Sequence, residues 1–376
     1  MYPNRPVWAE VDLDAVLDNL RRIRRRVGSA VRVMAVVKSD AYGHGKLEVV
    51  EKLHRYCDWL GVSFIDEGVE LRQAGYDLPI LCLVSPLPDE LDALIKYELT
   101  PVISDLSLGR ALSERLEFQG RAPVKVHLKV DTGMGRLGVW HADAAGLAVE
   151  LAALPKIELG GMMTHFPLAD GADKSFAREQ IRRFAAVIDA VRERGLQPGI
   201  CHAANTAAAL ELPESHFDMV RPGLALYGSY PSPHVGREIG LETAIALRAR
   251  LAVVKRLPAG TTISYGRRYR LERDTTVGVL PLGYADGWHR GMTGRARAIV
   301  RGERRPIIGV ICMDMSMIDL AGLEDVRAGE VVTLMGRDYS GELISVEEVA
   351  EWMNTIPYEV TCALSERVPR HYLGSG

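Results

Sequence analysis

Residues 33–57 read VMAVVKSDAYGHGKLEVVEKLHRYC, and this stretch contains one complete strand-to-helix unit. Residues 33–37 form a short apolar run, which is typical of a strand that is buried on both faces. Lys38 ends the run, and small and polar residues follow up to Gly45. Apolar residues then recur three to four positions apart through residue 57, which predicts an amphipathic helix.

The same alternation of strand and helix extends over the first part of the chain. Further apolar runs predict strands at residues 59–64, 80–84, 101–103, 124–130, 157–163, 199–201 and 217–220. Helical spacing lies between them, as at residues 13–27, 46–57, 143–154 and 174–194. Eight such units in roughly 230 residues favour a (β/α)₈ barrel, although a doubly wound open sheet would give a similar periodicity.

The pattern changes after the proline- and glycine-rich segment YPSPHVG at residues 230–236. Closely spaced β-like runs follow without long helices, at residues 246–256, 276–280, 295–301, 307–312 and 330–335. Such spacing is typical of an all-β module. We therefore expect an α/β barrel domain over residues 1–238 and a mostly-β domain over residues 239–376.

Composition excludes several classes of protein. The formal net charge of −3 leaves no basic surface of the kind that binds nucleic acid. No apolar run approaches the ~18 residues of a membrane span, and residues 1–10 do not resemble a signal peptide, so we expect a cytoplasmic protein. Five scattered cysteines without Cys-x-x-Cys spacing disfavour both a disulfide framework and a metal site.

Lys38 is the first candidate for chemistry, because it follows the first predicted barrel strand. Active sites of (β/α)₈ barrels lie at the carboxyl ends of the strands. A partly desolvated lysine has a lowered pKa and is nucleophilic enough to form a Schiff base with an aldehyde. Taken alone, the position of Lys38 favours a solvated lysine at the surface, because most lysines are solvated.

Polar residues follow several other predicted strands. Lys129 precedes the glycine-rich turn DTGMGRLG, which carries Arg136, and His165 follows the next strand. Asn205-Thr206 and the backbone amides of Gly223-Leu224 could bind a phosphate, as barrels often do after strands seven and eight. Individually, His165 could be structural, and Arg221, which follows strand eight, could form a surface or interface ion pair.

The second domain has its own groups of polar and aromatic residues. Tyr265 lies in SYGRRY, Tyr284 in GYADG and Met313 in CMDM, while Tyr358 lies near the C-terminus. Each of them could alone be an ordinary turn residue or a core aromatic with a hydrated hydroxyl. Only the whole set is specific.

Six motifs taken together resemble the alanine racemases, the fold-type III enzymes that use pyridoxal phosphate. They are AVVKSDAYGHG, KVDTGMGRLG, VRPGLALYG, SYGRRY, GYADG and CMDM, in this order. Ser39 is commonly alanine in the family and Thr206 is commonly serine. The resemblance implies a barrel, a β-domain that includes the strand near residues 7–13, and a head-to-tail homodimer with shared sites.

The resemblance also implies a role for each site residue. Lys38 carries the pyridoxal phosphate Schiff base, and Arg136 faces the phenolic oxygen of the cofactor beside Lys129, which is carbamylated in some relatives. Arg221 donates to the pyridine nitrogen. The remaining residues expected around the cofactor are Tyr42, His165, Asn205, Thr206, Gly223, Leu224 and Tyr358.

The implied reaction interconverts L-alanine and D-alanine through an aldimine between substrate and cofactor, and supplies D-alanine for peptidoglycan. Lys38 serves one face of the substrate and Tyr265 of the partner subunit serves the other. Nearby positive charge would favour the tyrosine phenolate, and His165 is a candidate for that charge. Arg136, with Met313 of the partner subunit, is expected at the substrate carboxylate. A methyl-sized pocket near Tyr265, Tyr284 and Tyr358 would favour alanine over larger amino acids.

Three other functions remain open at this stage. A serine or broad-specificity racemase would use the same chemistry, although Tyr284 and Tyr358 both narrow the site. A non-catalytic pyridoxal phosphate carrier shares the barrel and its lysine, but lacks the residues from 240 onward and hence Tyr265. A decarboxylase of the same two-domain fold would use a cysteine as an acid, and Cys312 is the only residue that favours it.

Overall fold

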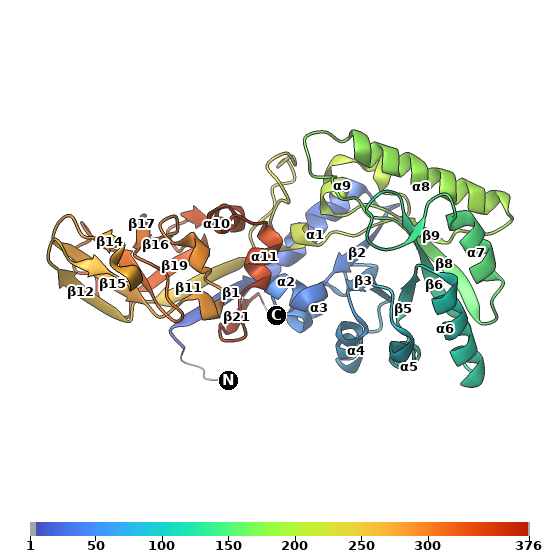
Figure 1. The fold of residues 1–376 in the computed structure, drawn as a ribbon, viewed down its shortest axis with the longest axis horizontal. Helices are drawn as coiled ribbons and strands as arrows, with labels where there is room; N and C mark the ends of the chain where they lie inside the picture. The colour runs from blue at the N-terminus through green and yellow to red at the C-terminus, as the bar shows by residue number, and fades with distance from the viewer. Residues whose placement is uncertain (1–4, 375–376) are drawn as a thin grey trace.

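The chain folds into two units that lie end to end (Figure 1). The computed structural model describes residues 5–374. A ring of parallel strands surrounded by helices occupies one end, and a β-rich domain occupies the other. No helix of the described residues is long and apolar enough to cross a membrane.

The barrel strands follow one another in space almost as they do in the sequence. The order is β10-β2-β3-β4-β5-β6-β8-β9, and all neighbours are parallel. Their bounds are β2 (Arg32–Val36), β3 (Trp59–Val62), β4 (Ile80–Cys82), β5 (Thr100–Ile103), β6 (Val124–Asp131), β8 (Ile157–Met163), β9 (Ile200–His202) and β10 (Met219–Val220). All eight predicted strands are thus confirmed. A short extra strand, β7 (Val139–Trp140), pairs with β6.

The sequential order confirms a near-barrel rather than a doubly wound sheet, in which the strand order would reverse. The ring is not closed by a continuous ladder between β9 and β10. The residues on either side of β10 form single backbone hydrogen bonds with β9 and the segment after it, from Asp218 N to Cys201 O and from Arg221 N to Ala204 O, both 2.9 Å long.

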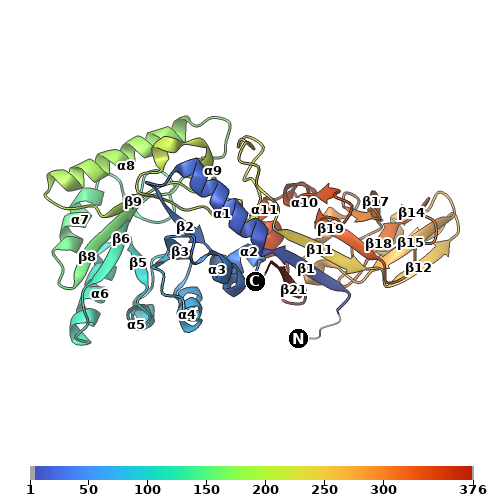
Figure 2. The same cartoon turned by 180° about the vertical axis from the view of Figure 1, so that it is seen from behind.

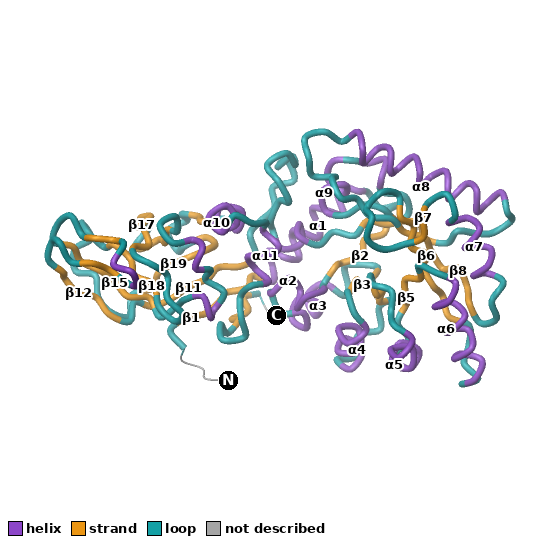
Figure 3. The backbone as a smooth tube through the Cα atoms, in the orientation of Figure 1, coloured by secondary structure: helices purple, strands orange, loops and turns teal. Residues whose placement is uncertain are grey.

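Helices cover the outside of the ring (Figure 3). They are α1 (Leu13–Val27), α2 (Lys38–Gly43), α3 (Lys46–Leu53), α4 (Ile65–Gln73), α5 (Leu91–Lys96), α6 (Leu106–Phe118), α7 (Ala144–Ala152), α8 (Ser175–Glu193) and α9 (Thr206–Glu211). Helix α1 has its predicted bounds because the Asp12 carboxylate accepts a hydrogen bond from Ala15 N and Gly28 ends the last turn. The helix predicted at residues 46–57 ends earlier, at Leu53.

The interior of the ring is layered, which determines where chemistry is possible. Met34, Leu81, Val102, Met163 and Met219 form one apolar cluster contributed by five different strands. Buried polar side chains lie at other positions of the ring: His127 and Lys129 on β6, His202 at the end of β9, and Arg221 directly after β10. Because barrel interiors are normally filled by aliphatic layers, a buried polar layer marks the functional region.

The second domain is built around one large sheet with the order β12-β15-β18-β17-β16-β19-β11-β1-β21. Its strands are β1 (Val7–Asp12), β11 (Ile245–Arg250), β12 (Val253–Leu257), β15 (Thr275–Leu280), β16 (Arg297–Val300), β17 (Glu303–Ile308), β18 (Ser316–Asp319), β19 (Val331–Arg337), β20 (Leu343–Ile344) and β21 (Arg370–Leu373). A hairpin of β13 (Thr262–Ile263) and β14 (Tyr269–Arg270) and two helices, α10 (Val346–Met353) and α11 (Pro357–Cys362), complete the domain.

Two predicted strands of this domain are wrong in their bounds. The run at residues 246–256 is not one strand, because β11 pairs with β1 and β19 while β12 pairs with β15. The run at residues 307–312 belongs to β17 only up to Ile308, since Gly309 leaves the strand with a φ of +69°. The expectation of a mostly-β domain is confirmed, and α10 and α11 are helices that the β-like runs did not predict.

The N-terminal strand links the two units (Figure 2). Strand β1 lies in the sheet of the second domain, antiparallel to β11 and parallel to β21, and continues directly into α1 of the barrel. Helix α11 in turn packs against α2. A Cβ on Gly43 would lie 2.3 Å from Thr361 O, so this close approach requires glycine.

Candidate active site

A cavity of about 440 Å³ opens at the carboxyl ends of the barrel strands. The structure brings eleven of the sequence-predicted residues together in its lining: Lys38, Tyr42, Lys129, Arg136, His165, Asn205, Thr206, Arg221, Gly223, Leu224 and Tyr358. Residues that the sequence did not single out, such as Ser63, Asp170 and Pro231, also line it. These three belong to loops and carried no motif.

Lys38 and Tyr42 enter the cavity from an unusual turn. Residues 39 to 42 all have φ between +51° and +57°, so α2 contains one left-handed turn although none of the four is glycine. The turn directs both side chains to the same cavity. Burial and the nearby Arg136 guanidinium lower the pKa of Lys38, which favours its nucleophilic free amine.

Tyr42 lies against the corner predicted to bind phosphate. A Cβ at residue 223 would lie 2.3 Å from Tyr42 Oη, so only glycine fits there. Gly223 N donates to Thr206 Oγ1 over 3.1 Å. Asn205 begins α9, its Oδ1 accepting a hydrogen bond from Ala208 N over 3.1 Å. The corner thus gathers hydroxyl and amide groups, which are suitable donors for a phosphate.

Arg221 is wholly enclosed in the polar layer of the barrel. Its Nη2 donates to Thr164 O over 2.8 Å and to Ala203 O over 3.0 Å. Burial lowers the pKa of Arg221 to about 9, which leaves the guanidinium charged at neutral pH. Arg221 therefore provides the cavity with a permanent, rigidly held cation.

Two histidines that the sequence reading missed support Arg221. His202 Nδ1 lies 3.0 Å from Arg221 Nη1, and His202 Nε2 lies 2.8 Å from His127 Nδ1. Because a guanidinium can only donate, His202 Nδ1 accepts and its Nε2 carries the proton toward His127. His127 lies inside β6, where a single histidine gives no sequence signal, and His202 ends β9 outside any recognised motif.

His165 is not the positive charge that the sequence reading considered it to be. His165 Nδ1 lies 3.3 Å from Arg221 Nη2, so it accepts a hydrogen bond from a donor-only group. Burial, with Arg221 and Lys129 nearby, lowers the pKa of His165 well below its ordinary value. A neutral imidazole cannot stabilise a phenolate by charge.

Lys129 is buried beside this layer. Its Nζ has no hydrogen-bond partner among residues 5–374, and burial together with Arg221 lowers its pKa to about 7. The turn that follows is organised by Asp131, whose Oδ1 accepts from Gly133 N over 2.8 Å and from Met134 N over 2.9 Å. This turn carries Arg136 to the cavity.

Tyr358 reaches the cavity from the second domain. Its ring, on α11, lies 5.9 Å from the ring of Tyr42, centroid to centroid. Burial raises the pKa of Tyr358 to about 12, so the residue stays a neutral hydrogen-bonding phenol. The barrel cavity is therefore completed by a helix outside the barrel.

The three other predicted residues do not join this cavity. Tyr265, Tyr284 and Met313 lie on the second domain with exposed fractions of 72%, 41% and 52%. Tyr265 lines a different cavity with Cys312 and Met315, and the adjacent β14 lies toward the end of the molecule away from the barrel (Figure 1). Within a single chain, Lys38 and Tyr265 therefore lie in different cavities.

The loops of Tyr284 and Met313 are nevertheless held together. Tyr284 N donates to Cys312 O over 3.0 Å, and Ala285 N donates to Met313 O over 3.0 Å. A Cβ at Gly283 would lie 2.2 Å from Cys312 O, so the two loops touch through their backbones.

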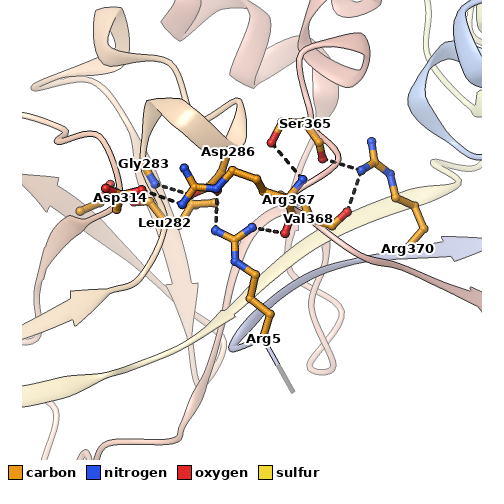
Figure 4. A network of polar contacts seen from close by, with 10 residues as sticks. Arg5, Leu282, Gly283, Asp286, Asp314, Ser365, Arg367, Val368 and Arg370 are labelled. Carbon is orange, nitrogen blue, oxygen red and sulfur yellow. Dashed lines mark hydrogen bonds and ion pairs between the residues drawn. The ribbon is translucent and has the colours of Figure 1, made fainter. Parts of the chain in front are cut away.

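A polar network stabilises these loops from behind (Figure 4). The wholly buried carboxylate of Asp286 pairs with Arg5 and Arg367 and accepts a hydrogen bond from Gly283 N over 3.0 Å. Arg367 also donates to Asp314 over 2.6 Å. Two partly exposed arginines and one buried carboxylate thereby connect the loops to the N- and C-terminal segments of the chain.

Fold and site together define a class of two-domain proteins: a barrel with a lysine after its first strand, joined to a β-domain. Residues 11–231 match the family described as "Alanine racemase, N-terminal domain", and residues 244–372 match "Alanine racemase, C-terminal domain". The chain belongs to the alanine racemase family.

Individual relatives agree over the whole chain. The alanine racemase of Carboxydothermus hydrogenoformans is 42% identical over 371 residues, which is 98% of this chain and 100% of the relative. The crystal structure of alanine racemase from E. faecalis superposes with a TM-score of 0.94 at 36% identity, covering 99% and 100% of the two chains. That of Bacillus anthracis with bound L-Ala-P gives 0.91 at 35% identity, covering 99% and 96%.

Proposed function

We propose that this chain interconverts L-alanine and D-alanine with pyridoxal phosphate, as a homodimer in which each site combines residues of both subunits. Residues 1–238 would form the cofactor-binding barrel and residues 239–376 the domain that reaches the partner. The observation that carries the proposal is the cavity in which Lys38 faces Arg136, Arg221 and the Thr206–Gly223 corner.

The residues present fit pyridoxal phosphate. Lys38 has a lowered pKa and offers an amine for a Schiff base at one side of the cavity. The same cavity offers the hydroxyls of Thr206 and Tyr42 beside Gly223, where a side chain would collide with Tyr42. The bound cofactor would supply a conjugated electron sink for the electron pair left when the Cα proton of the substrate is removed.

Each remaining group then has a definite task. Tyr42, Asn205, Thr206, Gly223, Leu224 and Tyr358 would hold the phosphate, and His165 would pack beside the ring. Arg221 would donate to the pyridine nitrogen and keep it unprotonated, since a guanidinium has no acceptor. His127 and His202, both neutral, hold Arg221 in that orientation.

Lys129 is a candidate for carbamylation. Its Nζ is buried and unpaired among the described residues, and its pKa of about 7 leaves much of the amine free at neutral pH. The free amine would attack carbon dioxide, form an N–C bond and release one proton. The product carries a carboxylate that would pair with Arg136 and remove the unpaired charge from the cavity.

Racemisation needs a proton acceptor on one face of Cα and a proton donor on the other. Lys38 would serve one face, and Tyr265 of the partner subunit the other. Arg136 and the backbone amide of the partner's Met313 would bind the substrate carboxylate, while the partner's Tyr284 would limit the side chain to a methyl group. The exposure of these three residues in the single chain supports a role at a subunit interface.

Incubation of the holoenzyme with L-alanine in deuterated water tests this proposal. We expect D-alanine to appear, with deuterium at Cα of both enantiomers, because the protons on Lys38 and on the partner's Tyr265 exchange with solvent. The Tyr265→Phe variant should exchange one enantiomer without inverting it. Rapid racemisation of serine with little of alanine would favour the broad-specificity alternative, and neither exchange nor inversion of any amino acid by the cofactor-loaded protein would favour the carrier.

A further inference from the structure

Ser264, the residue before Tyr265, has a backbone conformation that is almost restricted to glycine. Its φ is 65° and its ψ is −172°. An L-residue in this region is strained, and it persists only where the surrounding structure holds it. Since such strain concentrates at functional positions, the position of Ser264 next to the proposed acid–base residue calls for a physical cause.

The Ser264 side chain forms the hydrogen bond that stabilises this backbone conformation. Ser264 Oγ donates to Val310 O over 2.6 Å and lies 3.3 Å from Cys312 Sγ. The β13–β14 hairpin is thereby joined to the segment that leads to Met313. A serine-to-carbonyl bond across 46 residues is specific to this pair of segments.

The backbone of the facing segment is adapted to the same contact. A Cβ at Gly309 would lie 2.9 Å from Ser264 Cβ and 2.8 Å from Ile263 Cγ2. Gly309 also has a φ of +69°, so two features require glycine there. The hairpin therefore sits against residues 309–312 with no room for adjustment.

Tyr265 itself has little else to orient it within its own chain. Its side chain is 72% exposed, and it lies at the tip of the hairpin between Ser264 and Gly266, whose φ is +71°. A catalytic side chain must be held to within a fraction of an ångström. For Tyr265 that constraint has to come from the backbone on which it stands.

We infer that Ser264 is a positioning residue for Tyr265: its hydrogen bond to Val310 O holds the strained turn that directs the phenol ring out of the β13–β14 hairpin. The inference rests on the proposed role of Tyr265. It goes further because residues 309–313 then support both the Tyr265 hairpin and the Tyr284 loop. Val310 and Cys312 contact Ser264. The carbonyl groups of Cys312 and Met313 accept hydrogen bonds from the backbone amides of Tyr284 and Ala285.

A double-mutant cycle of Ser264→Ala and Tyr265→Phe tests the inference. Loss of the hydrogen bond should let residue 264 relax and displace the ring by about 1 Å, which would lower kcat for racemisation by about 100-fold. The KM for alanine should change little, since substrate binding does not depend on the proton transfer. In the Tyr265→Phe background, Ser264→Ala should cause no further loss.

Ser113→Ala is the matched control. Ser113 Oγ makes an equivalent bond, to Pro155 O over 2.5 Å, on the outer side of the barrel. This variant should keep its kcat even if its melting temperature falls. Ser264→Gly, which tolerates the same φ and ψ without strain, provides a well-folded second variant and should lower kcat as well, because it lacks the hydroxyl.

A structure of the cofactor-free Ser264→Ala protein gives a readout that does not depend on turnover. We expect residue 264 to return to a negative φ and the Tyr265 ring to move. An unmoved ring, an unchanged kcat, or an equal fold-loss in both backgrounds of the cycle would overturn the positioning role. Full racemisation by Tyr265→Phe alone would instead refute the proposed acid–base role itself.

Discussion

Burial of the Lys129 side chain lowers the free energy of unfolding of the protein. Its amine is buried without a partner among the described residues, and its pKa falls from the ordinary value of 10.5 to about 7. Between these two pH values the unfolded chain binds a proton that the folded chain does not, so the stability of the protein rises with pH. Below pH ~7 both states are protonated and the full penalty remains.

This reasoning predicts the behaviour of Lys129→Met. In cofactor-free, carbon dioxide-free buffer, the variant should have a higher free energy of unfolding than the wild type at pH ~6.5, and the difference should shrink as the pH approaches ~10. Urea denaturation at several pH values measures it. Lys125→Met, at an exposed position on the same strand, is the control and should show no such trend; a pH-independent difference for Lys129→Met would contradict the assigned pKa.

At the residue scale, site residues that belong to a motif can be predicted from the sequence, whereas isolated site residues cannot. Lys38, Arg136 and Arg221 follow strands within recognisable motifs, and the structure gathers them in one cavity. His127 and His202 could not be predicted, because their roles depend on a contact between two strands that are 75 residues apart. The lowered pKa of His165 could not be predicted either, since burial beside Arg221 cannot be read from one chain position.

At the scale of elements, α2 is the segment that connects local strain to the site. Four consecutive residues adopt the left-handed conformation, which costs about 1–2 kcal/mol for each L-residue. The sequence SDAY does not predict four left-handed residues in a row, because it contains no glycine or asparagine and Asp40 is its only residue of a type that adopts this conformation at single positions. Helix α1, in contrast, was predictable to the residue from its periodicity, Asp12 cap and Gly28.

Ser39→Gly should therefore stabilise the protein. Ser39 is exposed, and relief of its left-handed strain exceeds the ~0.5–1 kcal/mol that glycine costs in added chain entropy, which leaves a net gain of about 0.5–1 kcal/mol. Chemical denaturation measures the change. Ser107→Gly, at an exposed helical position in α6, should be destabilising by a similar amount; destabilisation of Ser39→Gly would show that the turn is not strained.

At the scale of the whole molecule, the chain carries two incomplete halves of one site. The barrel presents Lys38 in its cavity, and the second domain presents Tyr265 on an exposed hairpin toward the far end (Figure 1). The two-domain division could be expected from the change in periodicity after residue 230. The periodicity does not show that β1 belongs to the sheet of the second domain, because this depends on pairing with β11, whose residues are more than 230 positions away.

The central claim is that two copies complete each other's sites, and a heterodimer tests it most directly. Lys38→Ala and Tyr265→Phe chains, each nearly inactive alone, are co-expressed with different tags and the mixed dimer is purified. One of its two sites then carries an intact Lys38 and an intact Tyr265 of the partner subunit, so about half of the wild-type activity should return. A verified heterodimer without recovered racemisation would contradict the shared site.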